Sequence, residues 1–270
     1  MGKLYGPYRL IGTVGGIRHY RLNNSEDITA AGKGGANKNL IMNSPAFART
    51  RENMAEMTPR ANLAKQVKIK LGLWSVPIVN RYLIGAINAA LRIAQKRDEN
   101  GYKGCKSIYL SQHRDVLNIP SYYYYKPFRD IMKCPYTVET GVDRKSVTVH
   151  LSNFIPKEQI KPPSEATHFK FCLSIGVVFD MIYHPEEKRF IPAYGGHFET
   201  GSLKEFESEW IPINASSMGD QDFTSALPEN YVLKDDMTVL RIFGIVFGKH
   251  TYGMETLKND RGSAEFLGAV

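Results

Sequence analysis

The amino-acid sequence predicts an α+β protein, with an N-terminal β-hairpin and helical region followed by an antiparallel immunoglobulin-like β-sandwich. Three observations support this fold class. Residues 10 to 35 alternate small or apolar residues with polar ones between glycine turns, residues 45 to 96 repeat apolar side chains at helical spacing, and the apolar period changes to two after residue 105. We expect two domains, a basic hairpin and helical region over 1–104 and a β-sandwich over 105–270, with 105–135 as a bridging segment.

The first segment is expected to form a hairpin with an irregular, glycine-loosened strand. Its apolar residues flank three turn sites, with Leu10, Val14, Ile17 and Tyr20 beside turns at Gly12, Gly15–Gly16 and Asn23–Asn24. The "GKGG" that follows lacks the Ser or Thr and the preceding buried strand of a phosphate-binding loop. We therefore expect a flexible basic loop there.

Helix signals begin at Ser44–Pro45, an N-cap followed by the residue best tolerated at the first helical position. Thr58–Pro59 repeats the signal, so the first helix is expected to break there and a second to begin. A third helix is expected from residue 78 to 96. Its buried face is predicted at Val79, Leu83, Ala86, Ile87, Ala90 and Ala94, with Arg81, Asn88, Arg92 and Gln95 opposite.

The second half has the alternation of strands. Inward-facing side chains are expected at Val147, Val149 and Leu151 in one strand and at Phe169, Phe171 and Leu173 in another. The apolar run "MTVLRIFGIVF" is expected to be a strand with a bulge at Gly244. About seven strands separated by Pro and Gly turns favour the immunoglobulin-like sandwich.

Charge is divided unevenly along the chain. Residues 1–135 hold 22 Lys and Arg against 8 Asp and Glu, whereas residues 136–270 hold 13 against 19. A basic half joined to an acidic half suits a nucleic-acid or acidic-surface partner. It equally suits head-to-tail stacking of copies, in which one copy's basic half meets the next copy's acidic half.

The helical region is a candidate nucleic-acid surface because no acidic residue occurs from residue 57 to 97. The candidate contacts are Lys65, Lys68, Lys70, Arg92, Lys96 and Arg97. A merely solvated basic face is the simpler interpretation, since no helix-turn-helix spacing or RNA-binding aromatic pattern accompanies these charges.

The stretch "SPAFARTRENMAEM" is expected to be mainly scaffold. On a helix, Arg49 can meet Glu52, and Glu56 can reach Arg60, so much of its charge is neutralised internally. Arg51 faces Ala55 and has no such partner. It is the best candidate in this helix for a contact with another molecule.

A run of four tyrosines, Tyr122, Tyr123, Tyr124 and Tyr125, stands out in composition. On a strand these side chains point to both faces. A strand buried between the helical and β parts, a subunit contact and a platform for base stacking all remain open.

No catalytic motif is present, and we expect neither an enzyme nor a cofactor. His184 and His197 with Glu205, Glu207 and Glu209 could be imagined as metal ligands, but the alternating glutamates are more simply a solvated acidic strand edge.

Cys105, Cys134 and Cys172 are expected to be reduced and buried. With no membrane span and no signal peptide expected, we place the protein in the cytoplasm, with export by a route lacking a cleavable signal left open.

Three stretches carry a resemblance to known sequences: "GTVGGIRHYR", "NSPAFARTREN" and "PPSEATHFKF". Together they are similar to a family of uncharacterised proteins widespread in the Bacteroidota, from about Leu10 to Phe171. The family has no assigned activity, so the resemblance implies an architecture and no site residues. This sequence departs from the family at Thr58–Pro59, where the family continues as one helix.

We therefore hypothesise a non-enzymatic, self-assembling structural protein, a homo-oligomer or filament with no small-molecule substrate. The basic contacts are expected at Arg18, Arg21, Lys33, Arg49 and Arg51. The acidic contacts are expected at Glu205, Glu207 and Glu209, with Tyr122 to Tyr125 as an apolar contact. The alternatives are a nucleic-acid-binding protein that uses the basic helices, and an enzyme with an unrecognised site.

Overall fold

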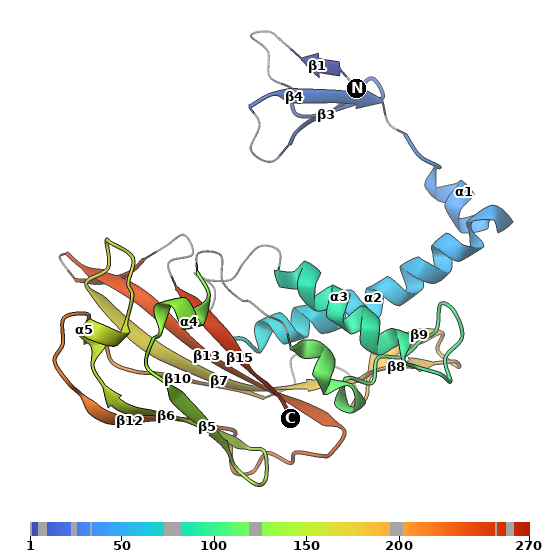
Figure 1. Ribbon diagram of the computed structural model, residues 1–270. Coiled ribbons are helices and arrows are strands. Elements are labelled where there is room, and N and C mark those ends of the chain that lie inside the picture. Colours follow the sequence, from blue (N-terminus) through green and yellow to red (C-terminus); the bar gives the residue numbers. More distant parts are fainter. Residues whose placement is uncertain are drawn as a thin grey trace. The chain divides into compact units, whose positions relative to one another are not determined.

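The computed structural model shows a mixed α+β chain made of two compact units, residues 1–52 and 53–270 (Figure 1). The expected α+β class is confirmed: an N-terminal sheet is followed by helices and then by antiparallel sheets. The division into units falls within a helix and not after residue 104, because the later helices share a core with the sheets. The structure describes residues 2–4, 10–22, 26–32, 34–72, 83–118, 126–194, 202–251, 253–257 and 262–270.

The first unit contains a four-stranded antiparallel sheet in the order β1-β4-β3-β2. Its strands are β1 (Gly2–Leu4), β2 (Gly12–Val14), β3 (Ile17–Arg21) and β4 (Ile28–Gly32). A two-residue turn joins β2 to β3, where Gly15 and Gly16 have φ angles of 56° and 79°. Such hairpin turns need this left-handed conformation. The expected hairpin is therefore confirmed, whereas the predicted turn at Asn23–Asn24 lies outside the described residues.

Two short helical elements follow the sheet, α1 (Lys38–Asn43) and the 3-10 helix η1 (Pro45–Phe47). The Asn37 side chain caps α1 by accepting a hydrogen bond from Leu40 N at 2.7 Å, which satisfies one of the free N–H groups of the first turn. The start signal at Ser44–Pro45 is confirmed, because Pro45 occupies the first position of η1.

The helix α2 (Ala48–Ile69) runs without interruption through Pro59. The predicted break at Thr58–Pro59 is therefore wrong. Proline inside a helix costs about 3 kcal/mol because it removes one backbone hydrogen bond. Here the Pro59 ring is buried, and Leu63 and Val67 continue the same packed face. Burial of this face outweighs the local cost, and the Thr58 hydroxyl donates to the Met54 carbonyl at 3.3 Å.

The helix α3 spans Leu83–Lys96. The predicted buried face is confirmed at Leu83, Ile87, Ala90 and Ala94. Two side chains differ from the prediction: Ala86 is exposed, and Gln95, expected on the solvent side, is buried. The Gln95 amide donates to the Lys106 carbonyl at 2.7 Å, so a loop folds over a position that looked solvated. Val79 and Arg81 lie outside the described residues.

Two antiparallel sheets face each other in the second unit (Figure 1). The smaller has the order β12-β6-β5. In the larger, β10 and β11 pair with one side of β7, β13 pairs with the other, and β14 and β15 share the far side of β13. The strands are β5 (Tyr136–Thr140), β6 (Ser146–Phe154), β7 (His168–Phe179), β10 (Leu203–Glu207), β11 (Ile211–Pro212), β12 (Gly219–Ala226), β13 (Met237–His250), β14 (Met254–Thr256) and β15 (Ser263–Ala269).

The second unit also contains smaller elements. In the part of it that the structure describes, a separate hairpin joins β8 to β9, and short helical segments lie in the connections. Their bounds are β8 (Met181–His184), β9 (Arg189–Pro192), η3 (Leu110–Gln112), η4 (Arg114–Leu117), α4 (Phe128–Ile131) and α5 (Pro156–Gln159).

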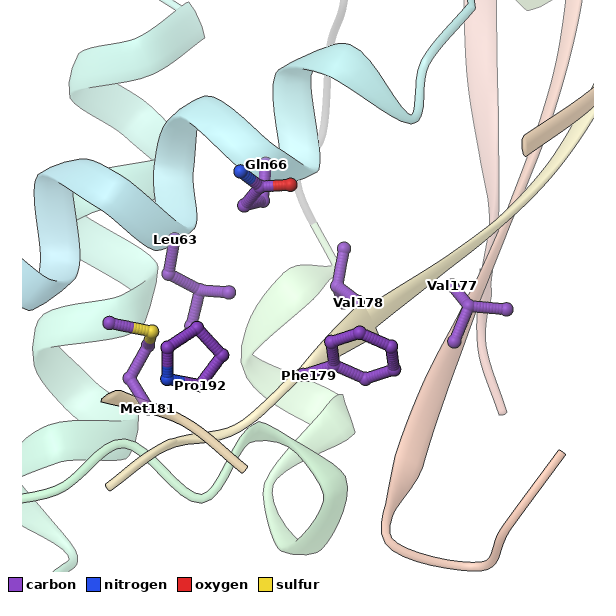
Figure 2. Close-up of a pocket in the computed structure, with 7 residues that line it drawn as sticks. All are labelled: Leu63, Gln66, Val177, Val178, Phe179, Met181 and Pro192. Carbon is purple, nitrogen blue, oxygen red and sulfur yellow. The ribbon is translucent and has the colours of Figure 1, made fainter. Parts of the chain in front are cut away.

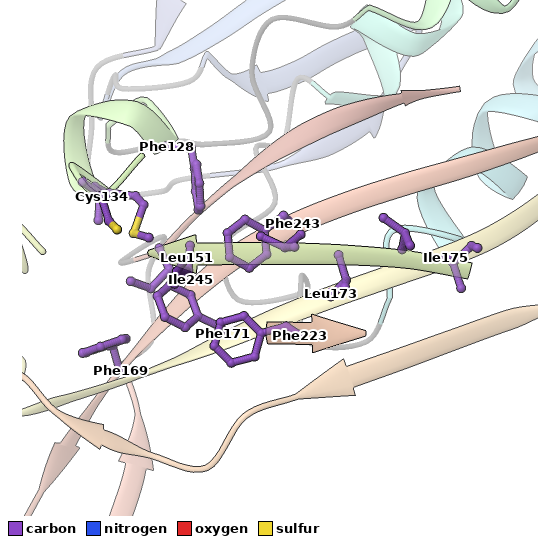
Figure 3. Packing of buried hydrophobic residues seen from close by; sticks show 14 of the residues in the cluster. Phe128, Cys134, Leu151, Phe169, Phe171, Leu173, Ile175, Phe223, Phe243 and Ile245 are labelled. Atoms are coloured by element: carbon purple, nitrogen blue, oxygen red, sulfur yellow. The ribbon is translucent and has the colours of Figure 1, made fainter. Parts of the chain in front are cut away.

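Aromatic side chains fill the space between the two sheets (Figure 3). The Phe171 ring lies 5.1–5.4 Å, centroid to centroid, from the rings of four other phenylalanines, namely Phe154, Phe169, Phe223 and Phe243. Val147, Val149, Leu151, Phe169, Phe171 and Leu173 are buried here, as predicted. Such pairs add about 0.5–1.5 kcal/mol each beyond the area they bury.

Helices α2 and α3 cover the opposite face of the larger sheet. There Leu63, Val67 and Leu91 pack with β-strand residues, including Cys172 and Ile242, in a second core. Strands β7 and β13 are therefore buried on both faces, which is why β13 reads as an almost continuous apolar run.

The predicted bulge at Gly244 is wrong. The β7–β13 register continues without a shift through the Gly244–Cys172 pair. The irregularity lies instead between β13 and β15, near Leu240 and Ile242. It coincides with Gly268 on β15, whose φ of 103° is open to glycine and strained for other residues. Gly244 instead lies on the face that the helices cover, with Ile242 and Val246.

Two Gly→Ala substitutions are expected to have opposite effects on stability. A Cβ at Gly176 would lie 2.7 Å from the Cβ of Lys70, the residue that follows α2, so Gly176→Ala should destabilise the fold by about 1–3 kcal/mol. At Gly85, exposed on α3, a Cβ meets nothing within 4 Å, and Gly85→Ala should stabilise by up to about 1 kcal/mol. Urea unfolding of both variants measures this difference. A Gly176→Ala protein as stable as the parent would contradict the close packing of α2 on β7.

Candidate functional site

The sheet of the first unit carries exposed aliphatic side chains on one face. Strand register puts Val14 beside Ile17, on the same face as Arg21 and as the buried side chains of His19 and Ile28. Val14 and Ile17 are 59% and 47% exposed. Leu10, Ile11 and Leu22, in the segments next to the strands, are also exposed. The exposed pair Val14 and Ile17 on this small sheet suits a surface that another chain covers.

The same unit is basic. Residues 1–52 hold eight Lys and Arg against three Asp and Glu, a net charge of +5. Arg21 is exposed on the aliphatic face, while Arg18 lies on the other face, 5.6 Å from the centre of the Tyr20 ring. Lys38, which the sequence reasoning did not single out, is also exposed. Lys33 lies outside the described residues.

The arginines of α2 serve the local structure. Arg49 pairs with Glu52 at 2.8 Å, as predicted. The expectation that Arg51 has no partner is wrong, because its Nη1 donates to the carbonyls of Ile41 and Ser44, both at 2.8 Å. These are carbonyls at the end of α1 that have no donor within that helix. Arg51 therefore fastens α1 to the start of α2.

The six candidate nucleic-acid residues divide into two groups. Lys65, Lys68, Arg92 and Lys96 are exposed. Lys70 is buried, with its stem packed on Gly176, and this burial lowers its pKa. The Arg97 guanidinium makes two hydrogen bonds to the Asp115 carboxylate, at 2.9 and 3.0 Å. The first group therefore keeps basic charge at the surface, while Lys70 is buried and Arg97 is paired with Asp115 of the same chain.

The predicted acidic edge is smaller than expected. Strand β10 ends at Glu207, so Glu209 does not share the strand face with Glu205 and Glu207. Glu207 forms an ion pair with Lys170, whose ammonium lies 5.1 Å from the centre of the Trp210 ring. The tyrosines Tyr122, Tyr123, Tyr124 and Tyr125, and also His197, lie outside the described residues.

A second acidic surface, which the sequence reasoning missed, covers the outer face of β5, β6 and β12. His150 on β6 lies between carboxylates of both neighbouring strands: its Nδ1 is 2.8 Å from Asp222 and its Nε2 is 3.4 Å from Glu139. The hydrogen bond to Asp222, reinforced by Glu139, raises the pKa of His150. These residues are far apart in sequence and become neighbours only through strand register.

The concave spaces among the described residues include a small cavity and an open groove. A cavity of about 10 Å³ lies between α2 and the end of β7, lined by Leu63, Gln66, Val177, Val178, Phe179, Met181 and Pro192 (Figure 2). It has room for about one water. An open groove of about 510 Å³ lies along α1, lined by Asn37, Asn39, Leu40, Asn43, Ser44 and Pro45.

The thiols and the metal-ligand residues show no reactive arrangement among the residues described. Cys134 and Cys172 are buried, as predicted, and burial raises the pKa of both; Cys105 is half-buried. No group of three or more His, Cys, Asp or Glu side chains in the described segments could hold a metal ion. None of the helices placed by the structure is long and apolar enough to cross a membrane.

The strongest features are therefore two exposed sheet faces: the aliphatic and basic face of the N-terminal sheet, and the acidic outer face of β5-β6-β12. Both suit contact with a large partner better than capture of a small molecule. No protein-family model, curated protein or solved structure matches this chain.

Proposed function

We propose that this protein is a non-enzymatic structural protein that assembles with copies of itself, its basic N-terminal unit contacting the acidic β domain of a neighbour. The single observation that carries the proposal is the exposed aliphatic pair of the first unit, Val14 and Ile17. Side chains of this type gain about 1.5–3 kcal/mol each when they are fully buried.

The size of the first unit also supports the proposal. Its sheet has strands of three to five residues, and Ile28 is the aliphatic side chain buried in the described part of this sheet. Ordering each residue costs about 1–2 kcal/mol of backbone entropy. Sheets and domains this small usually need a metal, a disulfide or association with another surface. Residues 1–52 contain no cysteine, and the described part of the unit offers an exposed surface for association.

Charge favours a neighbour's β domain over a neighbour's N-terminal unit. Two copies of the first unit, each carrying +5, repel one another. Residues 136–270 hold 13 Lys and Arg against 19 Asp and Glu, so this part of a neighbour attracts the unit. Such a contact joins different surfaces on the two copies, and its repetition gives a ring or a filament.

We further propose that the β domain is immunoglobulin-like. In chain order, the first, second and fifth main strands (β5, β6, β12) form one sheet, and the third, sixth and seventh (β7, β13, β15) form the other, with β10 at its edge. This division corresponds to strands A-B-E and C-F-G of the immunoglobulin arrangement. Membership of the uncharacterised Bacteroidota family is a related proposal, supported by the N-terminal motifs.

Removing the aliphatic pair is the direct test of assembly. The parent protein should form species larger than a monomer at low salt, and the double variant Val14→Ser with Ile17→Ser should be a monomer. The reason is that the interface of the variant has no apolar centre. Multi-angle light scattering measures both. The matched control is Val142→Ser, a fully exposed valine in the turn between β5 and β6, which should assemble like the parent. A parent protein that stays monomeric at high concentration and low salt would end the proposal.

Nucleic-acid binding is the second candidate. It is favoured by one observation, namely that Lys65 and Lys68 on α2 and Arg92 and Lys96 on α3 remain exposed in a segment free of acidic residues. Charge reversal at Lys68 and Lys96 should weaken binding to any sequence and lower the slope of log K against log salt by about one for each phosphate that the protein no longer neutralises. Electrophoretic shift and fluorescence anisotropy measure it. Lys157→Glu, an exposed lysine on α5, is the control. Absence of binding to both DNA and RNA at low salt would exclude this function.

A further inference from the structure

The outer face of the three-stranded sheet β5-β6-β12 has the properties of a docking surface. Its outward side chains are exposed or half-buried, and they include no Lys or Arg. By register they are Thr137, Glu139, Thr148, His150, Ser152, Asp222 and Thr224. Five of these seven side chains are short threonine, serine or aspartate residues.

Hydrogen bonds across the strands hold this face in one arrangement. The Thr148 and Thr224 hydroxyls are 2.9 Å apart, and His150 lies between Asp222 on one side and Glu139 on the other. Surfaces whose side chains are already ordered lose less conformational entropy on binding. The two carboxylates are still 65% and 77% exposed, so they remain available to a partner.

The face of the N-terminal sheet that carries Val14 and Ile17 has complementary properties. Gly12, Ala30 and Gly32 lie on this face by strand register, together with the buried side chains of His19 and Ile28. Arg21 lies on this face and is exposed. Sheets pack face to face, and arginine binds carboxylates in two-point contacts at interfaces.

We infer that the outer face of β5-β6-β12 is the acceptor on which the N-terminal sheet of a second copy docks, with Arg21 directed to Glu139 and Asp222. This inference rests on the proposed self-assembly and names the surface that receives the unit. The donor and acceptor faces belong to different units of one chain, so each copy has one of each. Copies therefore join head to tail.

A pair of variants tests the acceptor. Glu139→Lys with Asp222→Lys should weaken self-association by roughly tenfold or more, because like charges then face each other. The control, Glu99→Lys with Glu158→Lys, makes the same change in net charge at two exposed sites away from this face and should assemble like the parent. The milder Glu139→Gln with Asp222→Asn keeps the side-chain shapes and should also weaken association, which guards against misfolding of the lysine variant.

Mixing two defective variants separates this inference from the general proposal. The Val14→Ser, Ile17→Ser protein lacks the donor face and the Glu139→Lys, Asp222→Lys protein lacks the acceptor face, so each alone should be a monomer. Mixed, they retain one working donor and one working acceptor and should form a dimer of one copy of each, and nothing longer. Sedimentation or light scattering counts the copies.

The outcomes distinguish the two ideas. If the acceptor variant assembles like the parent while the donor variant does not, self-assembly stands and this acceptor is wrong. If the mixture stays monomeric, the head-to-tail pairing of these two faces is overturned. If the parent itself is monomeric, both ideas fail.

Acidity should weaken the contact through His150. The groups that face its ring are Asp222 on β12 and Glu139 on β5, and both favour the protonated form. As pH falls through the pKa of His150, which lies above its usual value, the ring gains a charge that opposes docking of a basic sheet. Association of the parent should fall over this range, and His150→Gln should remove that part of the pH dependence. An unchanged pH dependence in His150→Gln would argue against this face as the acceptor.

Discussion

The pairing of β7 with β13 is the interaction on which the larger unit depends. Twelve consecutive residue pairs join the two strands, and both faces of the pair are buried. One face must fit aromatic rings such as Phe171 and Phe243, and the other must accept helices at close range. Cys172, Ser174 and Gly176 supply that second face with small side chains, so α2 can approach until the stem of Lys70 touches the strand. The smaller sheet and both helices are placed by this strand pair.

The local sequence pattern could predict one face of these strands and not the other. A period of two identifies Phe169, Phe171 and Leu173 as inward residues, and they are buried in the sandwich. The same period marks Cys172 as outward, because nothing in the local sequence reveals that helices from earlier in the chain cover it. Pro59 is a second case in which tertiary packing overrides a local signal. Its helix-breaking tendency is local, whereas the packing that keeps the helix continuous is tertiary.

The sequence could predict which part of the chain is basic. It could not predict which charged side chains are available to a partner. Composition correctly marks the N-terminal half as basic, but Arg51 binds carbonyls of its own chain, and Lys70 is buried. A single sequence does not reveal such internal partners. The acidic face was not predicted from the sequence, for a different reason. Glu139 and Asp222 belong to no sequence motif, and only strand register brings them to either side of His150.

The same dependence on register makes the acidic face a reporter of correct folding. A slip of one residue between β12 and β6 reverses every side chain of β12. Phe223 would then point outward and Asp222 into the aromatic core. The register shifts between Gly219 and Gln221 and then continues without a shift to Ala226. In a head-to-tail assembly, a slipped copy would present an apolar surface without its carboxylate and would not be incorporated. If copies join through this face, the assembly would select correctly paired copies, because the attachment surface exists in only one strand register.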